Sequence, residues 1–306
     1  MSMTVTMTGL VDAEYFDVQS KCVGDTFRIF VAKPSFVPPG KYPAIYVADG
    51  NGIFLLATAI QRMLSLGAEC PPAYVIGIGY PTEGGLMAAM AKRNRDYAPT
   101  DGGDYARAVL NSTVAPGGEA FLRFIREELK PSLEARYDVD PGEATFFGSS
   151  LGGLIGAWIL LTAPDTFQRY ILASPTISWN QEEVWHWEQA YASAHQDLKA
   201  TVLVSAGSLE APEVVRINAV HVAENSPMVR EQVESIIAWC DRHGWPRTTD
   251  LPHEFAARLR SRNYAGLKIH AHTLPDETHM SVSPAILSRG LRYVFGHWQP
   301  FDHRHN

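Results

Sequence analysis

Apolar runs without alternation occur at several places in the chain and are separated by segments with a helical period. PAIYVADG (43–50) and AYVIGIGYP (73–81) are two such runs, which are typical of strands covered on both faces. Residues 52–66 between them have the apolar spacing of a helix, so this region predicts a strand–helix–strand unit. Further strands are predicted at 144–147, 169–173, 201–206 and 267–274, and a last helix at 285–295.

Alternating apolar and polar positions near the start of the chain predict an antiparallel pair of strands. The two segments, 14–20 and 26–34, are separated by a turn at Gly24–Asp25. Farther along, a spacing of four predicts an amphipathic helix around Phe121, Ile125, Leu129 and Leu133. Pro131 is expected to bend this helix or to split off its last turn, because proline cannot donate the helical hydrogen bond.

Three segments depart from the alternation of strands and helices and are expected to be excursions from the sheet. Residues 82–116 are rich in glycine and polar groups and show no clean period, which predicts a long loop. Residues 176–198 contain three tryptophans, and residues 211–266 are largely helical in pattern. The sequence thus predicts one α/β domain over 1–306, with a mostly parallel sheet, helices on both faces, and excursions that form a lid or pocket walls.

Composition narrows the class of protein. The 306 residues carry a formal net charge of -7 and no basic stripe, which argues against nucleic acid as the main partner. Three distant cysteines (Cys22, Cys70 and Cys240) do not predict a disulfide framework. The N-terminus lacks the pattern of a signal peptide, and no run reaches the ~20 apolar residues of a membrane span. These features predict a cytoplasmic protein, and they are compatible with a homo-oligomer.

The most informative segment is ATFFGSSLGGLIGAWILLTA (144–163), in which a buried strand leads through a sharp turn into an apolar helix. Gly148 and Gly152 flank Ser150 at two residues on either side, the spacing of the turn that exposes a serine nucleophile. The start of the following helix directs N–H groups toward negative charge on this serine. Ser149 is the competing serine, and an ordinary glycine-rich turn is the alternative interpretation.

A serine nucleophile needs a base, and on this type of sheet the chain order is serine, acid, histidine. His279 follows the last predicted strand, whereas the other ten histidines lie in insertions, within a strand or near the C-terminus. Glu210 stands just beyond the strand 201–206, and Glu213 is its nearest rival for the role of acid. Asp276 and Glu277 are expected to shape the histidine loop. The spacing of His272, Asp276 and His279 matches no strong zinc pattern, so no metal is predicted.

An oxyanion hole needs two N–H donors. Leu151, directly after the serine, is the first candidate. The second is expected in the turn after 43–49, at Gly50 or Asn51, and the choice between them stays open.

Several motifs in series carry a family resemblance: YVADGNGIF, VIGIGYP, RNRDYAPT, GSSLGGL, YILASPTISW, GSLE and THMSV. In this order they resemble the putative esterase family of α/β-hydrolases, which includes siderophore esterases and esterase D-like enzymes. The resemblance covers residues 14–295. It implies an eight-stranded α/β-hydrolase fold and serine esterase chemistry, with Ser150, Glu210 and His279 at the positions of the family's triad.

The resemblance also places residues 93–97 near the substrate cleft. Arg93 or Arg95 is then a candidate to bind an anionic or phenolic acyl group, with a solvated charge cluster or an Arg95–Asp96 pair as the alternative. Trp179 is a candidate for an aromatic pocket wall, although helical aromatics are more often packing. Residues 211–266 are longer than the usual connection, which predicts a distinct lid, so siderophore specificity does not carry over.

Together these observations predict a carboxylic-ester hydrolase that acts on a small-molecule ester through an acyl-enzyme and needs no metal or organic cofactor. Acyl transfer to an acceptor other than water is the alternative, because the same triad serves both reactions. A non-catalytic binding protein on a hydrolase fold is the third interpretation.

Overall fold

A mixed sheet forms the centre of the molecule. The computed structural model describes residues 5–6, 9–35, 37–83, 85–110 and 112–296. In this part of the chain, nine strands form the order β1-β2-β3-β5-β4-β6-β7-β8-β9. Strands β4 to β9 are parallel, and β1, β2 and β3 add to one edge in antiparallel register. The strands are β1 (Val5–Thr6), β2 (Ala13–Gln19), β3 (Thr26–Ala32), β4 (Tyr42–Val47), β5 (Tyr74–Gly79), β6 (Val139–Ser149), β7 (Arg169–Ala173), β8 (Ala200–Gly207) and β9 (Leu267–Leu274).

The strand predictions are confirmed. β7 and β9 have the predicted bounds, and β2 and β3 form the predicted antiparallel pair. The eight strands β2 to β9 make up the expected α/β-hydrolase sheet, and the two-residue β1 extends its edge. β4 and β5 are almost wholly buried, which explains why their sequences are apolar without alternation.

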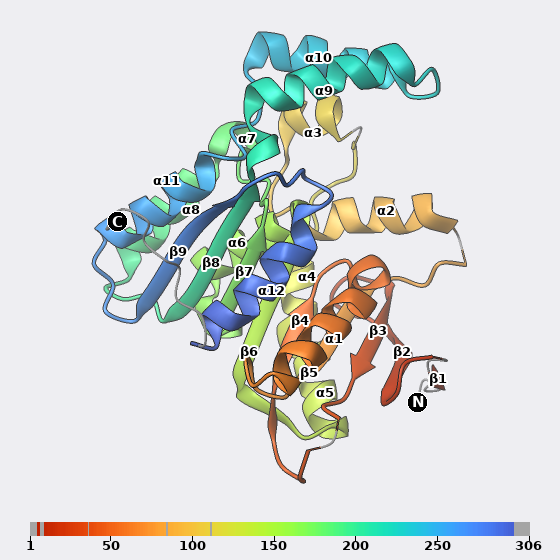
Figure 1. Ribbon diagram of the computed structural model, residues 1–306, viewed down its shortest axis with the longest axis vertical. Helices are drawn as coiled ribbons and strands as arrows, with labels where there is room; N and C mark the ends of the chain where they lie inside the picture. The colour runs from red at the N-terminus through yellow and green to blue at the C-terminus, as the bar shows by residue number, and fades with distance from the viewer. Residues whose placement is uncertain (1–4, 7–8, 36, 84, 111, 297–306) are drawn as a thin grey trace.

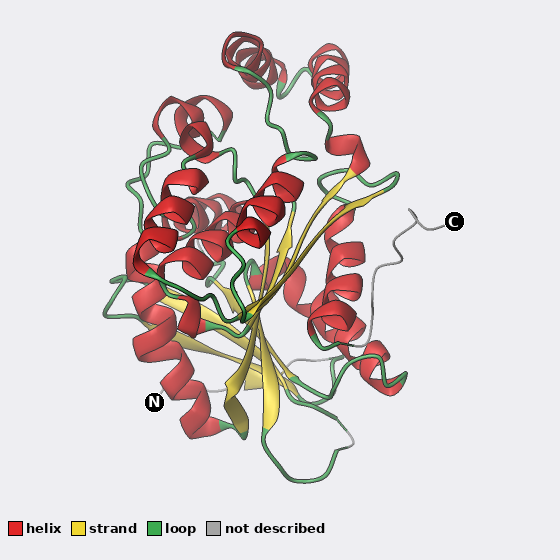
Figure 2. Cartoon of the chain, turned by 90° about the vertical axis from the view of Figure 1, so that its left-hand side faces the viewer, coloured by secondary structure: helices red, strands yellow, loops and turns green. Residues whose placement is uncertain are grey.

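Helices cover both faces of the sheet, as Figure 2 shows. Neighbouring residues of β6 serve different cores: Phe146 packs with the helices of one face, and Phe147 with those of the other. The Phe147 face is covered by α1 (Gly50–Leu66) and α12 (Val282–Val294). The Phe146 face is covered by α4 (Gly118–Arg123), α5 (Lys130–Arg136), α6 (Leu151–Thr162), α8 (Val184–Ala194) and α11 (Leu251–Ser261).

The helix predicted around Phe121 and Leu133 is present but is not uniform. Between α4 and α5 the chain forms a π-helical stretch, Phe124–Leu129, just before Pro131. The helix therefore departs from α geometry before the proline rather than after it, and α5 continues to Arg136. A wider turn at this point suits a residue that has no N–H to donate.

The prediction of a long loop for 82–116 is wrong in part, because this segment contains α2 (Gly85–Asp96) and α3 (Gly103–Val109). In sequence, the apolar residues of α2 all lie within its first seven positions, and α3 has only seven residues, so neither shows a helical period. The other two excursions contain α7 (Trp179–Glu182), α9 (Pro212–Asn225) and α10 (Arg230–His243) besides α8 and α11. In Figure 1, α9 and α10 lie side by side at the top, above α3.

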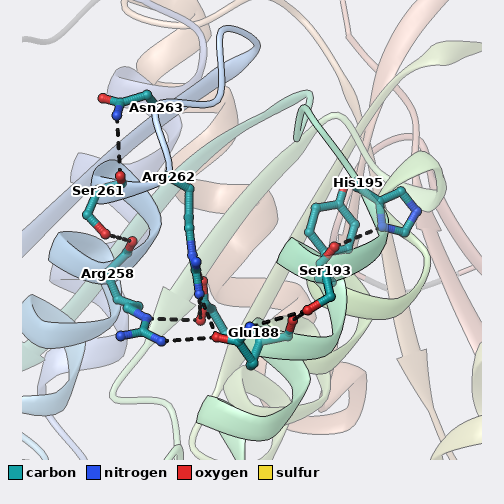
Figure 3. A network of polar contacts seen from close by, with 9 residues as sticks. Glu188, Ser193, His195, Arg258, Ser261, Arg262 and Asn263 are labelled. Carbon is teal, nitrogen blue, oxygen red and sulfur yellow. Dashed lines mark hydrogen bonds and ion pairs between the residues drawn. The ribbon is translucent and has the colours of Figure 1, made fainter.

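A polar network joins α8 to α11 on the Phe146 face (Figure 3). The fully buried Glu188 carboxylate accepts hydrogen bonds from Arg258 at 3.0 Å and from Arg262 at 2.6 and 2.9 Å. Burial alone would raise the pKa of Glu188, but the hydrogen bonds from Arg262 and Arg258 outweigh it and lower this pKa. The negative charge of Glu188 is thus compensated by the two arginines, and the contacts fix α11 against α8.

Candidate active site

Ser150 occupies the turn between β6 and α6 in a backbone conformation that L-residues rarely adopt. Its φ is 57° and its ψ is −120°, and its N–H donates to the carbonyl of Ala173 at 2.9 Å. The turn is so tight that only glycine fits at position 148, because a Cβ there would lie 2.0 Å from the carbonyl oxygen of Gly152. A strained serine at a strand–helix turn costs about 1–3 kcal/mol and is typical of a nucleophile. The competing Ser149 instead makes a 2.9 Å contact with Ser283 on α12.

Glu210 and His279 are directly hydrogen-bonded. The distance from His279 Nδ1 to Glu210 Oε2 is 2.6 Å. The other oxygen, Oε1, accepts from Ser174 Oγ at 2.5 Å and from the Gly207 N–H at 2.8 Å. Glu210 is buried, whereas the His279 side chain is 45% exposed. The carboxylate is therefore fixed by two donors and orients the imidazole that faces solvent.

The acid turn and the histidine loop are held together by backbone contacts. The Leu209 N–H donates to the carbonyl of Glu277 at 3.0 Å, and Ser208 Oγ accepts from the Asp276 N–H at 2.9 Å. Gly207 is necessary at this junction, because a Cβ there would lie 2.2 Å from the Glu277 carbonyl oxygen. The predicted role of Asp276 and Glu277 in shaping the loop agrees with these contacts.

Ser150 and His279 line the same cavities, although no hydrogen bond joins them in the part of the chain that the structure describes. The Ser150 hydroxyl lies 3.4 Å from Thr176 Oγ1. Thr176 also donates its N–H to the Ser150 carbonyl at 3.1 Å, so the segment after β7 stabilises the turn that contains Ser150. Ser174 and Thr176 were not predicted from the sequence. Their position at the carboxyl end of a strand beside the serine strand was the available signal.

The candidate oxyanion donors lie at the starts of two helices. Leu151 is the first residue of α6, and Gly50 and Asn51 are the first two residues of α1. The first N–H groups of a helix have no partner within it. The Asn51 side chain exchanges two hydrogen bonds with the backbone of Tyr80, at 2.8 and 2.9 Å, and this fixes the turn against β5. Asn51 lines a cavity with Ser150, whereas Gly50 is buried against β5.

Two of the residues proposed for substrate binding line neither cavity at Ser150. Arg95 pairs with Asp96 and with Asp25, and neither cavity at Ser150 includes it. Trp179 is 2% exposed, packs against Tyr105, and lines neither cavity at the serine. The two cavities at Ser150 thus give Arg95 and Trp179 no support as substrate-binding residues, and that role stays a prediction for both. The internal Arg95–Asp96 pair, the alternative raised by the sequence, is the arrangement found.

Arg93 does line a cavity at Ser150, but its charge already has a partner. Its guanidinium donates to the two carboxylate oxygens of Asp49 at 2.6 and 3.1 Å. Arg93 lies largely buried, which alone would lower its pKa, and the negative charge of Asp49 outweighs this effect and raises it. Because the pair is neutral overall, Arg93 is not a ready-made site for a free carboxylate.

Two cavities meet at the serine. The first has a volume of about 470 Å³ and lies between α1, α2 and the start of α12; we call it the α1–α2 cavity. The second has a volume of about 480 Å³ and lies beneath α9 and α10; we call it the hairpin cavity. They share Ser150, His279 and Met280. Each is within the size range of ligand pockets.

No group of three or more His, Cys, Asp or Glu side chains among the described residues is arranged to hold a metal ion. No described helix is long and apolar enough to span a membrane.

Sequence comparison identifies the family. A sequence model of the putative esterase family matches residues 20–238. The chain belongs to the putative esterase family. This confirms the resemblance carried by the motifs, and the matched range includes both Ser150 and Glu210.

Curated relatives of this esterase are named for their action on siderophores. The ferri-bacillibactin esterase BesA of Bacillus subtilis is 32% identical over 278 residues, which cover 88% of this chain and 84% of that protein. The siderophore triacetylfusarinine C esterase of Aspergillus fumigatus is 30% identical over 274 residues, covering 86% of this chain and 84% of that protein. The chain is thus a carboxylic ester hydrolase, as predicted.

A solved structure agrees with the fold. The BES protein from Bacillus cereus is 28% identical and superimposes with a TM-score of 0.72, covering 96% of this chain and 98% of that one. The siderophore hydrolase EstA from Aspergillus nidulans, at 24% identity and a TM-score of 0.74, covers 93% of this chain and 94% of that one and supports the fold alone. The α/β-hydrolase fold is therefore confirmed.

Proposed function

We propose that this esterase cleaves carboxylic esters through an acyl-enzyme on Ser150, with His279 as general base and Glu210 as the orienting acid. The observation that carries the proposal is the 2.6 Å hydrogen bond from His279 Nδ1 to the buried, doubly held Glu210 carboxylate. This bond leaves Nε2 of the ring to act as the base, in a cavity that also contains the Ser150 hydroxyl.

In the proposed reaction the Ser150 hydroxyl turns from Thr176 toward His279 when substrate binds, since catalytic hydrogen bonds are often long before substrate is present. Ser150 Oγ bonds to the acyl carbon while His279 takes the hydroxyl proton. The N–H of Leu151 and that of Asn51 or Gly50 stabilise the oxyanion. The ester C–O bond then breaks, and His279 gives its proton to the leaving alcohol. Water activated by His279 releases the acid and restores Ser150.

The length of residues 211–266 argued against carrying siderophore specificity over, but the relatives at 30% and 32% identity are named for siderophores. Siderophore esters are therefore the first substrate class to test. Their alignments cover more than four fifths of both chains, which makes a shared substrate class the simplest proposal. Hydrolysis is favoured over acyl transfer because the named activities of these relatives are esterase activities.

The test is replacement of the nucleophile. Ser150→Ala should lower kcat/KM at least about a thousandfold, the scale of loss when a triad member is removed. Ser149→Ala is the matched control and should cost less than tenfold, because Ser149 contacts Ser283 rather than the triad. A fluorophosphonate probe should label the wild type and Ser149→Ala but not Ser150→Ala. Full turnover or full labelling of Ser150→Ala would refute the proposal.

A further inference from the structure

The two cavities at Ser150 extend in different directions from the same three residues. Among the residues that the structure describes, only Ser150, His279 and Met280 line both the α1–α2 cavity and the hairpin cavity. Met280 is 85% exposed and follows the catalytic histidine directly, so its side chain stands where the two spaces meet. An ester carbon placed at Ser150 Oγ therefore has room on each side for a group that would fill a cavity of its own.

The walls of the hairpin cavity include apolar side chains of α9 and α10 that are not buried in a protein core. On α9, Val215, Ala219 and Val222 recur at the spacing of one helix face, and all three line this cavity. Val233 and Ile236 of α10 face the same space. Only Ala223 and Cys240 are buried on these two helices, whose main neighbours are each other, α3 and the turn at Glu210. Their apolar face thus points at the catalytic serine instead of at a protein core.

The α1–α2 cavity has different lining residues, and it is unsuited to a charged substrate group. Ile53 and Leu56 of α1 and Met90 of α2 provide apolar walls. The charged pair that reaches this cavity, Arg93 and Asp49, is internally neutral. A carboxylate placed here would compete with Asp49 for Arg93 and leave one negative charge without a partner.

We propose that the two cavities bind the two halves of a single ester, so that preferred substrates carry bulky, uncharged groups on both the acyl and the alcohol side. The α9 positions Val215, Ala219 and Val222 then determine how large the group in the hairpin cavity can be. Leu56 has the same role in the α1–α2 cavity. This inference rests on the proposed function, because it takes Ser150 as the point where the ester is cleaved.

The experiment uses purified full-length enzyme and three sets of neutral esters: long acyl with short alcohol, short acyl with long alcohol, and long on both sides. For the wild type, we expect kcat/KM for the doubly extended esters to exceed that for either singly extended set by at least about tenfold, since apolar contacts at Ser150 then add on both sides. A doubly extended ester that reacts no faster than the better single extension would overturn the inference.

Variants with matched controls show which side of the ester each cavity binds. Ala219→Phe, with Val222→Phe as a second variant, fills the hairpin cavity, and Leu56→Trp fills the α1–α2 cavity. Their controls carry a matching substitution on exposed neighbours outside these cavities: Ile217→Phe on α9 and Leu55→Trp on α1. We expect the filling variants to lower the extended-to-short ratio of kcat/KM about tenfold, each on a different side of the ester, and the controls to keep the wild-type ratio.

Failure of this inference differs from failure of the proposed function. If the variants at 219 and 56 reduce the ratio on the same side of the ester, or on neither side, the division into two cavities is wrong while Ser150 chemistry stands. If wild-type activity survives Ser150→Ala, the proposed function is wrong whatever the ratios. Thermal melting of each variant identifies those that do not fold, and Val222→Phe then replaces Ala219→Phe.

Discussion

Arg93 on α2 holds the Asp49 carboxylate through two hydrogen bonds, at the turn that joins β4 to α1. Asp49 has a left-handed backbone, with φ 57° and ψ 41°, and its N–H donates to the hydroxyl of the buried Tyr97 at 2.8 Å. The Arg93 guanidinium also lies over the Tyr97 ring, 5.3 Å from its centroid. Arg93 and Tyr97 therefore fix the turn whose next two residues are the candidate oxyanion donors Gly50 and Asn51.

The first prediction follows from this contact. Arg93→Met should lower kcat for neutral esters about a hundredfold with little change in KM, because a small displacement of an oxyanion donor weakens only the transition state. Asp49→Asn should act in the same direction, and Arg93→Lys should restore part of the activity. Steady-state kinetics on neutral and anionic esters measures these effects.

Arg95→Met is the matched control, since Arg95 lies two residues away on α2 and pairs with Asp96 and Asp25 outside both cavities. It should lower the melting temperature while leaving kcat near the wild-type value. If Arg93→Met instead raised KM for anionic esters only, Arg93 would be a substrate-binding residue and not a positioning residue.

The second prediction concerns the acid. Glu210→Gln should lower kcat about ten-thousandfold, because an amide pointing its NH₂ at His279 favours the wrong imidazole tautomer. Ser174→Ala removes one of the two donors to Glu210 Oε1 and should cost about tenfold. Glu213→Gln, on the exposed first turn of α9, should retain wild-type turnover. If Glu213→Gln lost activity and Glu210→Gln kept it, Glu213 would be the acid of the triad.

Chain order predicted the pairing of Glu210 with His279 but left Glu213 as a rival, because both glutamates follow the same strand. Glu210 and His279 each follow a parallel strand of the sheet, and the carboxyl ends of such strands meet at one edge, so the prediction depended on fold class. Ser174 donates to Glu210 from a backbone with φ 40°, a conformation that no sequence pattern marks, and it was not predicted.

Whether a charged or aromatic side chain lines the cavity at Ser150 was harder to predict than the positions of the candidate triad residues. Arg93 and Arg95 have the same residue type and lie on the same helix, yet one lines the cavity at Ser150 and the other pairs with Asp96 and Asp25. The two differ only in the direction that the helix gives them, and α2 itself was not recognised as a helix. Trp179 could not be placed for the same reason, because its short turn has no period.

The last prediction concerns stability at acidic pH and rests on His270 of β9. Its ring lies 6.1 Å from that of His272 and 5.9 Å from that of Tyr293, and its Nε2 atom is buried without a hydrogen-bond partner among the described residues. Burial, followed by the positive charges of His272, Arg260 and His253, lowers the pKa of His270 to about 4. The folded protein therefore keeps this ring neutral under conditions in which the unfolded chain protonates it.

The sign follows from the two pKa values. The unfolded histidine titrates near about 6.5, so between this pH and about 4 the unfolded state binds the extra proton, and the free energy of unfolding falls as the pH is lowered. We expect a contribution of about 1–2 kcal/mol, since the side chain is only half-buried and solvent screens part of the effect. Urea unfolding of the wild type and of His270→Phe at several pH values between 7 and 4 measures it. The variant should lose less stability than the wild type across this range, and parallel losses in the two proteins would show that His270 does not titrate in the way its surroundings imply.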